Sequence, residues 1–215
     1  MATYWGVDSA APVTTHLYNC VMENLGKPAF WGRYLKTVQG SADGLTAEEI
    51  KRIHSRGTKI LPIYSSFQSA VGYRKGSVEA QNAIYYANRL EVPKGAPIFA
   101  NVEKFFDVDA NWLNGWFEAF YRSPYQPAYY FDSEEGNFMQ AFCEAIGTNK
   151  KIKSHTILWS AQPEPGETPA NRKPAYKPIV PPCGGNVWGW QYGRNVSSCP
   201  VDTDLVEPEL YLKLW

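Results

Sequence analysis

Short apolar runs recur along the chain at intervals of roughly 30 residues, with helical patterns between them. The runs are rich in Val, Ile, Tyr, Phe and Trp, which are residues that favour strands. They predict seven strands, at residues 3–9, 30–35, 59–65, 97–103, 127–133, 156–162 and 186–192. Because strands alternate with helices, we expect a parallel sheet whose strands are joined by crossover helices.

The segments between the predicted strands carry helix signals. Apolar residues lie three or four positions apart, with a capping residue before several of the segments or a glycine after them. The patterns are Val13, Leu17, Val21 and Leu25 before Gly26; Thr46–Glu49 with Ile50 and Ile53 before Gly57; Trp112, Leu113, Trp116 and Phe120 after the cap Asp107; and Phe138, Phe142 and Ile146. Residues 83–90 are also predicted to be helical, with one buried face.

These elements favour an α/β fold, a (β/α)8-type TIM barrel with a degenerate last unit. A doubly wound open sheet is the alternative, but no strand is followed by a G-x-G-x-x-G or P-loop turn. No change in composition marks a boundary, so residues 1–215 are expected to form one domain. The Pro-rich segment 162–185 is predicted to be an ordered loop on the active face, with a mobile lid as the other interpretation.

Charge and hydropathy narrow the possible partners. Lys plus Arg number 21, and so do Asp plus Glu. The chain therefore lacks the excess of basic residues that binding to nucleic acid or to a membrane surface would require. No apolar run is long enough for a membrane span, and residues 1–12 lack the basic start and apolar core of a signal peptide. We expect a soluble chain, either cytosolic or a mature form whose targeting segment is missing.

The chain is rich in aromatic residues, with 8 Trp and 14 Tyr. These side chains suit both large cores and sites that stack sugar rings. For Trp188 and Trp190, packing against the helices around the barrel is the preferred interpretation.

Polar side chains stand at the ends of the predicted strands, where barrel enzymes place their reactive groups. Those residues are Asp8, Arg33, Tyr34, Tyr64, Asn101, Glu103, Asp132, Trp159, Gln191 and Tyr192. Side chains alternate along a strand, so Asn101 and Glu103 are expected to share one face with Phe99. By the same alternation, small residues lie beneath polar ones: Gly6 pairs with Asp8, and Gly189 with Gln191.

Several carboxylates in a cleft with aromatic walls are what glycoside hydrolysis needs. One carboxyl group must be protonated to donate to the leaving oxygen, and a second must be ionised. An apolar wall such as Phe105 or Trp188 would raise the pKa of Glu103, which is the candidate acid. A solvated or ion-paired strand-end Glu is the competing interpretation.

The other reactive residue types point to no further chemistry. Cys183 and Cys199 flank the seventh strand and could pair, whereas Cys20 and Cys143 are predicted to be buried thiols. No zinc-type spacing appears, and Asp202-Thr203-Asp204 lacks the Gly and distal Glu of a calcium loop, so no metal or cofactor is expected. The histidines, which are His16, His54 and His155, lie away from the strand ends. This placement argues against nucleophilic catalysis by a triad that contains a histidine.

Five segments resemble a bacterial glycoside-hydrolase-like family of unknown function, which is distantly similar to the family 25 lysozymes, N-acetylmuramidases with a (β/α) barrel. The segments are GVDSA, FWGRYL, FANVE, WGWQYG and CPVDTDL, which start at residues 6, 30, 99, 188 and 199. The resemblance places the lysozyme D-x-E pair on Asn101 and Glu103, the first-strand Asp on Asp8, and the late V-D aspartate on Asp202. Asn101 departs from the pattern, because an amide cannot act as a carboxylate nucleophile or base.

We therefore expect a glycoside hydrolase acting on an amino-sugar polymer such as peptidoglycan. Glu103 is the expected general acid, with Asp8 or Asp202 as the charged partner. The expected substrate-binding residues are Asn101, Arg33, Tyr64, Tyr130, Asp132, Trp159, Gln191 and Tyr192. The first alternative is a catalytically inactive barrel that binds carbohydrate or cell wall, and a weaker one is a different hydrolase on the same scaffold.

The expected partner is a polysaccharide or oligosaccharide, bound by a monomeric chain with no nucleic acid or membrane involved. The resemblance also implies an extracytoplasmic or secreted location, with the cytoplasm as the alternative because residues 1–12 show no signal peptide.

Overall fold

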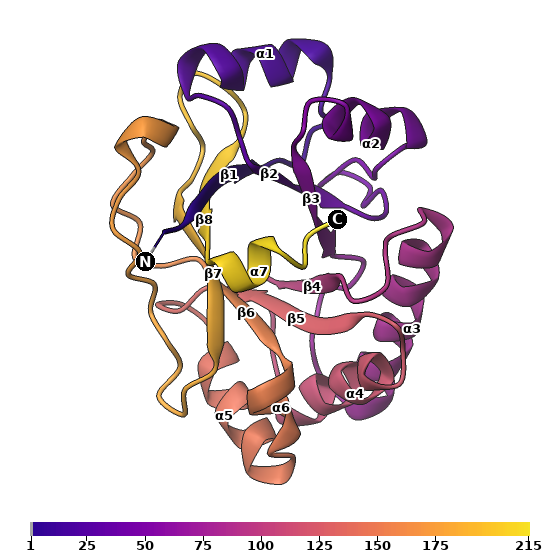
Figure 1. Ribbon diagram of the computed structural model, residues 1–215. Helices are drawn as coiled ribbons and strands as arrows, with labels where there is room; N and C mark the ends of the chain where they lie inside the picture. The colour runs from indigo at the N-terminus through magenta and orange to yellow at the C-terminus, as the bar shows by residue number, and fades with distance from the viewer. Residues whose placement is uncertain (1) are drawn as a thin grey trace.

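The strands close into a barrel. A computed structural model describes residues 2–215 and shows an eight-strand ring in the order β1 to β8 (Figure 1). The strands are β1 (Tyr4–Asp8), β2 (Phe30–Tyr34), β3 (Lys59–Tyr64), β4 (Pro97–Val102), β5 (Gln126–Phe131), β6 (Ile157–Ser160), β7 (Asn186–Gly193) and β8 (Asp202–Val206). All seven predicted strands are present to within a few residues, and the predicted α/β barrel is confirmed.

The eighth strand differs from the others. It was not among the predicted strands, and it runs antiparallel to both β7 and β1, whereas the other neighbouring strands are parallel. An antiparallel strand starts where its parallel neighbours end. The first residue of β8, Asp202, is therefore paired with the last residue of β1, Asp8.

Helices cover most of the outside of the barrel. They are α1 (Thr15–Asn24), α2 (Ala47–His54), α3 (Tyr73–Arg89), α4 (Ala110–Tyr121), α5 (Phe138–Thr148) and α6 (Lys151–His155), with the short α7 (Pro208–Tyr211) near the C-terminus. Thr14 and Thr46 cap α1 and α2 through their side chains. The cap of α4 is Asp109 and not the predicted Asp107, since the Asp109 carboxylate accepts from the Trp112 N–H. None of the described helices is both long enough and apolar enough to cross a membrane.

The segment 162–185 takes the place of an outer helix beside β7. Figure 1 shows it, with the 3-10 turn η1 (Ala170–Arg172), on the outside of β7 and β8. Trp190 donates to the Pro163 carbonyl and packs against Tyr176 of this segment, and it also belongs to an apolar cluster that includes residues of α1. Only the start of the segment adjoins the barrel mouth, where Glu164 pairs with Arg194. The prediction of an active-face loop is therefore right for that end alone.

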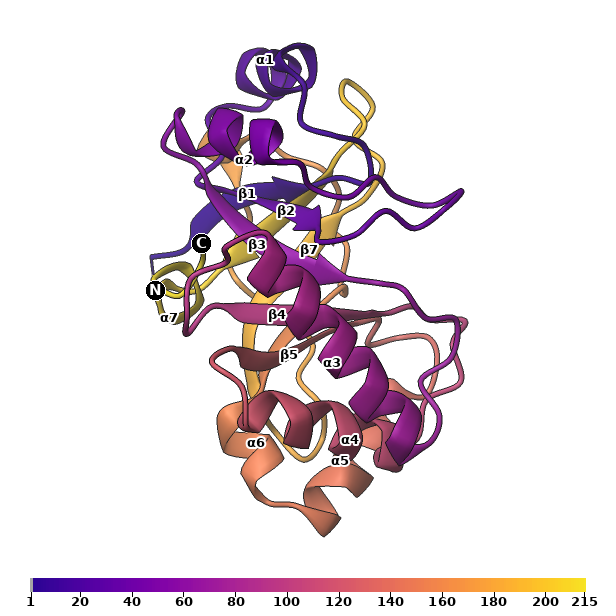
Figure 2. The ribbon, with the colours of Figure 1, turned by 90° about the vertical axis from the view of Figure 1, so that its right-hand side faces the viewer.

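The barrel interior is filled by a separate apolar cluster. Its members come from alternate positions of the strands and from the C-terminal segment: Phe30, Leu61, Ile63, Phe99, Ala128, Tyr130, Ile157, Trp159, Ala161, Val206, Leu210 and Leu214. Leu210 and Leu214 close the amino-terminal end of the barrel, and Figure 2 shows α7 and the C-terminus at that end. The polar residues are thus left at the opposite, carboxyl-terminal mouth.

Two disulfides join the outer segments to one another. Cys20 on α1 pairs with Cys199 before β8, and Cys143 on α5 pairs with Cys183 before β7. The prediction that Cys20 and Cys143 are buried thiols is wrong, and Cys183 and Cys199 do not pair with each other. Each bond holds an irregular segment flanking β7 against a helix, which constrains the unfolded chain and stabilises the fold.

Arg33 points away from the barrel interior and forms a buried ion pair. Its Nε lies 2.7 Å from Glu49 Oε1 on α2, and the side chain of Arg33 is fully buried. The same guanidinium donates to the carbonyls of Ser9, Ala10 and Asp43, and Glu49 also accepts from the Val13 N–H. This network ties α2 to the turns that follow β1 and β2.

Removing one charge from this pair should be costly. Glu49→Ala leaves the Arg33 guanidinium buried without its counter-charge, and we expect a loss of about 3–5 kcal/mol in the free energy of unfolding. Urea denaturation measures the loss, with Glu48→Ala, an exposed neighbour in the same helical turn, as the control. The control should lose less than about 1 kcal/mol. Equal effects in the two variants would contradict a stabilising role for the pair.

Candidate active site

Side chains from most of the strands meet at the carboxyl-terminal mouth of the barrel. Hydrogen bonds or close charge interactions connect the predicted residues Asp8, Asn101, Glu103, Tyr130, Asp132, Trp159, Gln191 and Asp202, together with residues that were not predicted. The alternation predicted for β4 is confirmed, because Phe99 lies inside while Ile98, Ala100 and Val102 face the helices. The polar residues at the strand ends therefore project into the mouth.

Gln191 is the centre of the hydrogen-bond network. Its amide Nε2 donates to Asp8 Oδ2 at 2.8 Å and to Asp202 Oδ2 at 3.2 Å. Its Oε1 accepts from the Tyr130 hydroxyl at 2.9 Å and from Arg194 Nε at 3.1 Å. Since Gln191 is buried, both ends of the amide are fixed, and the two aspartates are held in one arrangement.

A third aspartate lies beneath this pair. Asp204, two residues along β8, is fully buried and accepts from Trp159 Nε1 at 3.1 Å. Burial raises the pKa of Asp204 well above its usual range, and the charge of Asp8 and a hydrogen bond with Asp8 raise it further. Two carboxyl groups can share a hydrogen bond only if one holds a proton, so we interpret Asp204 as the neutral donor.

Asp8 and Asp202 differ in how their charge is supported. Burial, together with the charge of Asp202, raises the pKa of Asp8 to about 7. Burial also raises the pKa of Asp202, but the Asn195 N–H, 2.6 Å from Oδ1, and the charge of Arg194 oppose this effect. The surroundings of Asp202 thus favour the ionised form more than those of Asp8 do.

Glu103 lies just beyond β4 and is partly buried. Burial raises its pKa, whereas a hydrogen bond from Asn101 Nδ2 to Glu103 Oε1, at 2.8 Å, lowers it. Asn101 is itself held by Ser65 Oγ at 3.2 Å. The prediction that Phe105 forms an apolar wall beside Glu103 is wrong, because the Phe105 ring is 75% exposed. Trp188 instead packs against the interior cluster, which also contradicts the prediction that it faces the helices.

Arg194 forms the rim of the mouth together with two carboxylates. Its Nη2 lies 3.1 Å from Asp132 Oδ2 and its Nε lies 3.0 Å from Glu164 Oε1. Burial alone would raise the pKa of Asp132, but the backbone N–H groups of Glu134 and Glu135 and the Arg194 guanidinium bring it below its usual value. Asp132 is therefore a charged anchor for Arg194.

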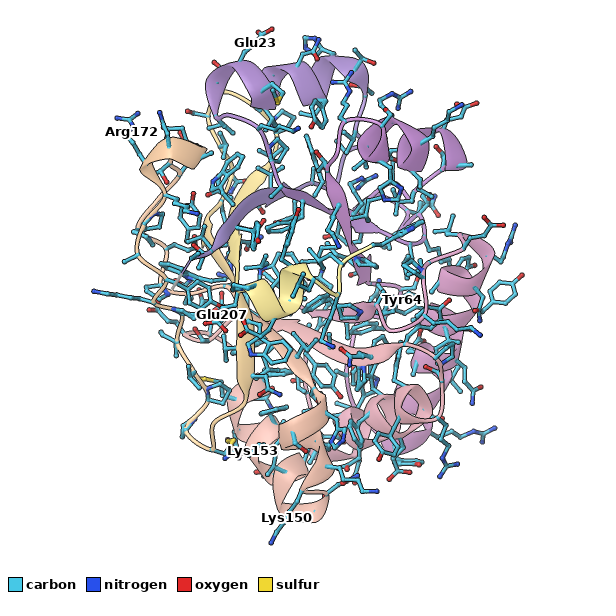
Figure 3. All side chains as sticks on the ribbon, viewed as in Figure 1. Glu23, Tyr64, Lys150, Lys153, Arg172 and Glu207 are labelled. Atoms are coloured by element: carbon cyan, nitrogen blue, oxygen red, sulfur yellow. A yellow bond between two sulfur atoms is a disulfide. The ribbon has the colours of Figure 1, made fainter. Side chains whose placement is uncertain are left out.

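Three predicted pocket residues lie on the other side of their strands. Arg33 pairs with Glu49, the Tyr64 hydroxyl donates to Glu79 on α3, and the Tyr192 hydroxyl accepts from Trp5 Nε1. Figure 3 shows Tyr64 on the side of the barrel toward α3. The physical reason is alternation: Asp8 is paired with Gly32, so Gly32 and Tyr34 share the interior face and Arg33 cannot.

The prediction missed three residues of this mouth, Glu164, Arg194 and Asp204, and it named Tyr34 at a strand end without including it among the substrate-binding residues. Burial and the nearby charges of Asp8 and Glu103 raise the pKa of Tyr34, which places its ring beside them. The alternation already applied to β1 would have selected Tyr34, because it lies two residues after Gly32. Arg194 follows the end of β7 and carried no signal beyond that position. Across residues 2–215, no group of three or more His, Cys, Asp or Glu side chains is arranged to hold a metal ion.

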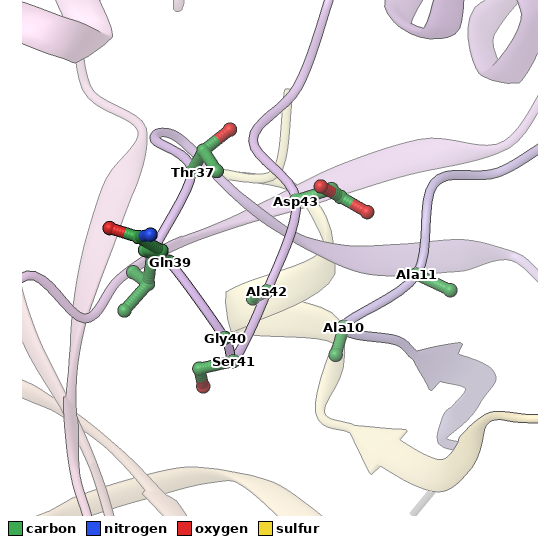
Figure 4. Close-up of a pocket in the computed structure, with 9 residues that line it drawn as sticks. Ala10, Ala11, Thr37, Gln39, Gly40, Ser41, Ala42 and Asp43 are labelled. Carbon is green, nitrogen blue, oxygen red and sulfur yellow. The ribbon is translucent and has the colours of Figure 1, made fainter.

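Two adjoining cavities open beside the aspartates. The first, of about 280 Å³, is lined by residues that include Asp8, Asn195, Pro200 and Asp202. The second, of about 560 Å³, lies between Ala10–Ala11 and residues 37–43 (Figure 4). Ala10 and Ala11 line both, so the second cavity adjoins the one at the carboxylate pair.

The raised pKa of Asp8 predicts how stability depends on pH. A carboxyl group that binds its proton more tightly when folded loses stability as the pH rises from its unfolded pKa to its folded one. The unfolding free energy of Asp8→Asn relative to wild type should therefore increase between about pH 4 and pH 7 and then level off. Denaturation at a series of pH values measures this difference. Asp132→Asn should show the opposite sign, with its change below about pH 4, because the pKa of Asp132 is lowered. A difference for Asp8→Asn that is constant with pH would contradict the account.

Solved structures with the same barrel span nearly the whole chain. A 1.07 Å crystal structure of a protein from B. stearothermophilus is 48% identical, with a TM-score of 0.97, and the match covers 99% of this chain and 100% of that one. The catalytic domain of the endolysin ply40, from a bacteriophage of Listeria monocytogenes, has a TM-score of 0.62 at 16% identity, with 99% and 97% covered. The autolysin LytC of Streptococcus pneumoniae, solved with a synthetic peptidoglycan ligand, has a TM-score of 0.62 at 14% identity, with 95% and 47% covered.

The last two likenesses show a shared fold with lytic enzymes. None of the curated proteins matches the chain. Residues 27–178, which include β2 to β6, match the Rv2525c-like, glycoside hydrolase-like domain. The chain therefore belongs to the Rv2525c-like family of glycoside hydrolase-like domains.

Proposed function

We propose that this protein is a glycoside hydrolase acting on an amino-sugar polymer such as peptidoglycan. The observation that carries the proposal is the placement of Glu103, a partly buried carboxyl group of raised pKa, at the same barrel mouth as the Asp8–Asp202 pair. Two carboxyl groups with different protonation states are the minimum that glycosidic hydrolysis needs.

The roles of the carboxyl groups follow from their surroundings. Glu103, with burial raising its pKa, is the general acid that gives its proton to the leaving glycosidic oxygen. Asp202, whose charge Arg194 and the Asn195 N–H support, is the ionised partner that faces the developing positive charge on the sugar. Gln191 positions Asp202 and Asp8, and the neutral Asp204 supports Asp8 from below.

The substrate class rests on the fold relatives. The LytC structure contains a synthetic peptidoglycan ligand, and the barrel it shares with this chain covers 95% of this chain. An uncharged amide at Asn101 also suits an acetamido group, which amino sugars carry. We propose an extracytoplasmic location for the same reason, and the two disulfides support it because such bonds persist in oxidising compartments.

A catalytically inactive sugar-binding barrel is the second candidate. One observation favours it: Asn101 stands two positions before Glu103 and donates a hydrogen bond to it, which supports the charged form of Glu103 and not the protonated form. Such a barrel would keep the mouth and the glycan affinity without turnover.

Glu103→Gln should separate the two candidates. If Glu103 is the acid, release of reducing sugars from purified peptidoglycan and chitin-type oligomers falls by about 10²–10⁴-fold, while binding in a pull-down persists. Glu135→Gln is the matched control, because Glu135 is an exposed carboxylate near the same mouth and forms an ion pair with Lys104. Binding without release by the wild type, unchanged in both variants, would instead favour the inactive barrel.

Asn101→Asp tests the same distinction through charge. A carboxylate at this position removes the donor to Glu103 and adds a like charge, so the pKa of Glu103 should rise. In an active enzyme the high-pH limb of the pH–rate profile, where the acid loses its proton, should then move to higher pH. If the Asn101→Asp variant releases sugar and the wild type does not, the barrel has lost catalysis at this residue.

A further inference from the structure

The cavity between the turns after β1 and β2 has fixed walls. We call it the hairpin groove, formed by Ala10, Ala11 and residues 37–43. Val38 and Ala42 pair as a small antiparallel bridge, and Ser41 N–H donates to the Val38 carbonyl. Asp43 N–H donates to the Ala10 carbonyl, so backbone hydrogen bonding connects the two walls.

The buried cation of Arg33 holds both walls at once. It donates to the Ala10 carbonyl on one wall and to the Asp43 carbonyl on the other, and Glu49 fixes its orientation. A groove whose walls share a buried, charge-paired donor keeps its width when the site is empty. Such preorganisation lowers the entropic cost of binding.

The lining suits a neutral ligand with many hydroxyl groups. Thr37, Gln39 and Ser41 are polar and accessible, and the rest of the lining consists of small residues with Val38 and Asp43, whose carboxylate disfavours an anion. Among the described residues that line this groove and the cavity at Asp8 and Asp202, none is Lys, Arg or His, which disfavours phosphate or another anion. The volume of about 560 Å³ falls within the usual range of about 300–1,000 Å³ for ligand sites.

We propose that the hairpin groove is a second saccharide subsite, which binds the sugars that continue from the linkage held at Glu103, Asp8 and Asp202. The inference rests on the proposed function, since it takes its ligand from the polymer proposed for the mouth. It also rests on adjacency, because Ala10 and Ala11 line both the groove and the cavity at the aspartates. Figure 4 shows Ala10 and Ala11 on one side of the groove and the 37–43 segment on the other.

Filling the groove from either wall tests the proposal. Ser41→Trp and Ala10→Trp place a large ring at exposed positions on opposite walls, and the Ser41 hydroxyl has no hydrogen-bond partner among the described residues. Ser154→Trp, at an exposed serine of α6, is the matched control. Calorimetry measures the affinity for peptide-free N-acetylglucosamine oligomers of increasing length, and a pull-down measures peptidoglycan binding. Melting temperatures show whether each variant is folded.

Wild type and Ser154→Trp should bind long oligomers more tightly than short ones. Both groove variants should lose about tenfold in affinity for long oligomers, with their affinity for short oligomers unchanged. Variants that match the wild type at every length would overturn the groove proposal and leave the proposed function standing. Weakened peptidoglycan binding with unchanged binding of the peptide-free oligomers would also overturn it, because the occupant would then be a peptide branch. A wild type that neither binds nor cleaves any of these glycans would refute the proposed function, and the groove proposal with it.

Discussion

The antiparallel pairing of β8 with β1 sets Asp202 directly opposite Asp8 at the barrel mouth, and the chemistry of the site depends on it. A parallel eighth strand would have its carboxyl end at the mouth and carry Asp202 toward the other end of the barrel. Burial raises the pKa of both aspartates, and the charge of Asp202 raises the pKa of Asp8 further. The Gln191 amide offsets part of this cost by donating a hydrogen bond to each aspartate. The folded barrel can therefore hold several carboxyl groups close together.

A second buried charge supports the same mouth from outside. Arg33 would be expensive to bury alone, but Glu49 and three backbone carbonyls satisfy its donors. Those carbonyls belong to the turns after β1 and β2, so the ion pair fixes the position of loops that a barrel otherwise leaves free. Stability and the proposed sugar groove therefore depend on one contact, and selection for either would retain it.

The sequence sufficed for the barrel and for much of the mouth. Strand periodicity located seven strands, and alternation placed Asp8, Asn101, Glu103 and Gln191 correctly inside. Alternation could also have excluded Arg33 from the interior. Asp8 points inward and pairs with Gly32 of β2, so the next residue, Arg33, must point outward. The eighth strand, DTDLV, has too few apolar residues for periodicity to find it. The disulfide partners depend on the path of residues 162–185, where no repeating pattern constrains the chain.

In the proposed mechanism, the glycosidic bond of the substrate lies between Glu103 and the paired aspartates. A crystal structure of Glu103→Gln soaked with a chitin-type oligomer tests it most directly, because the variant keeps the shape of the acid and cannot donate its proton. We expect a bridging oxygen within hydrogen-bond reach of the side chain at position 103 and a sugar ring facing Asp202. An oligomer bound elsewhere on the barrel, with the mouth empty, would contradict it.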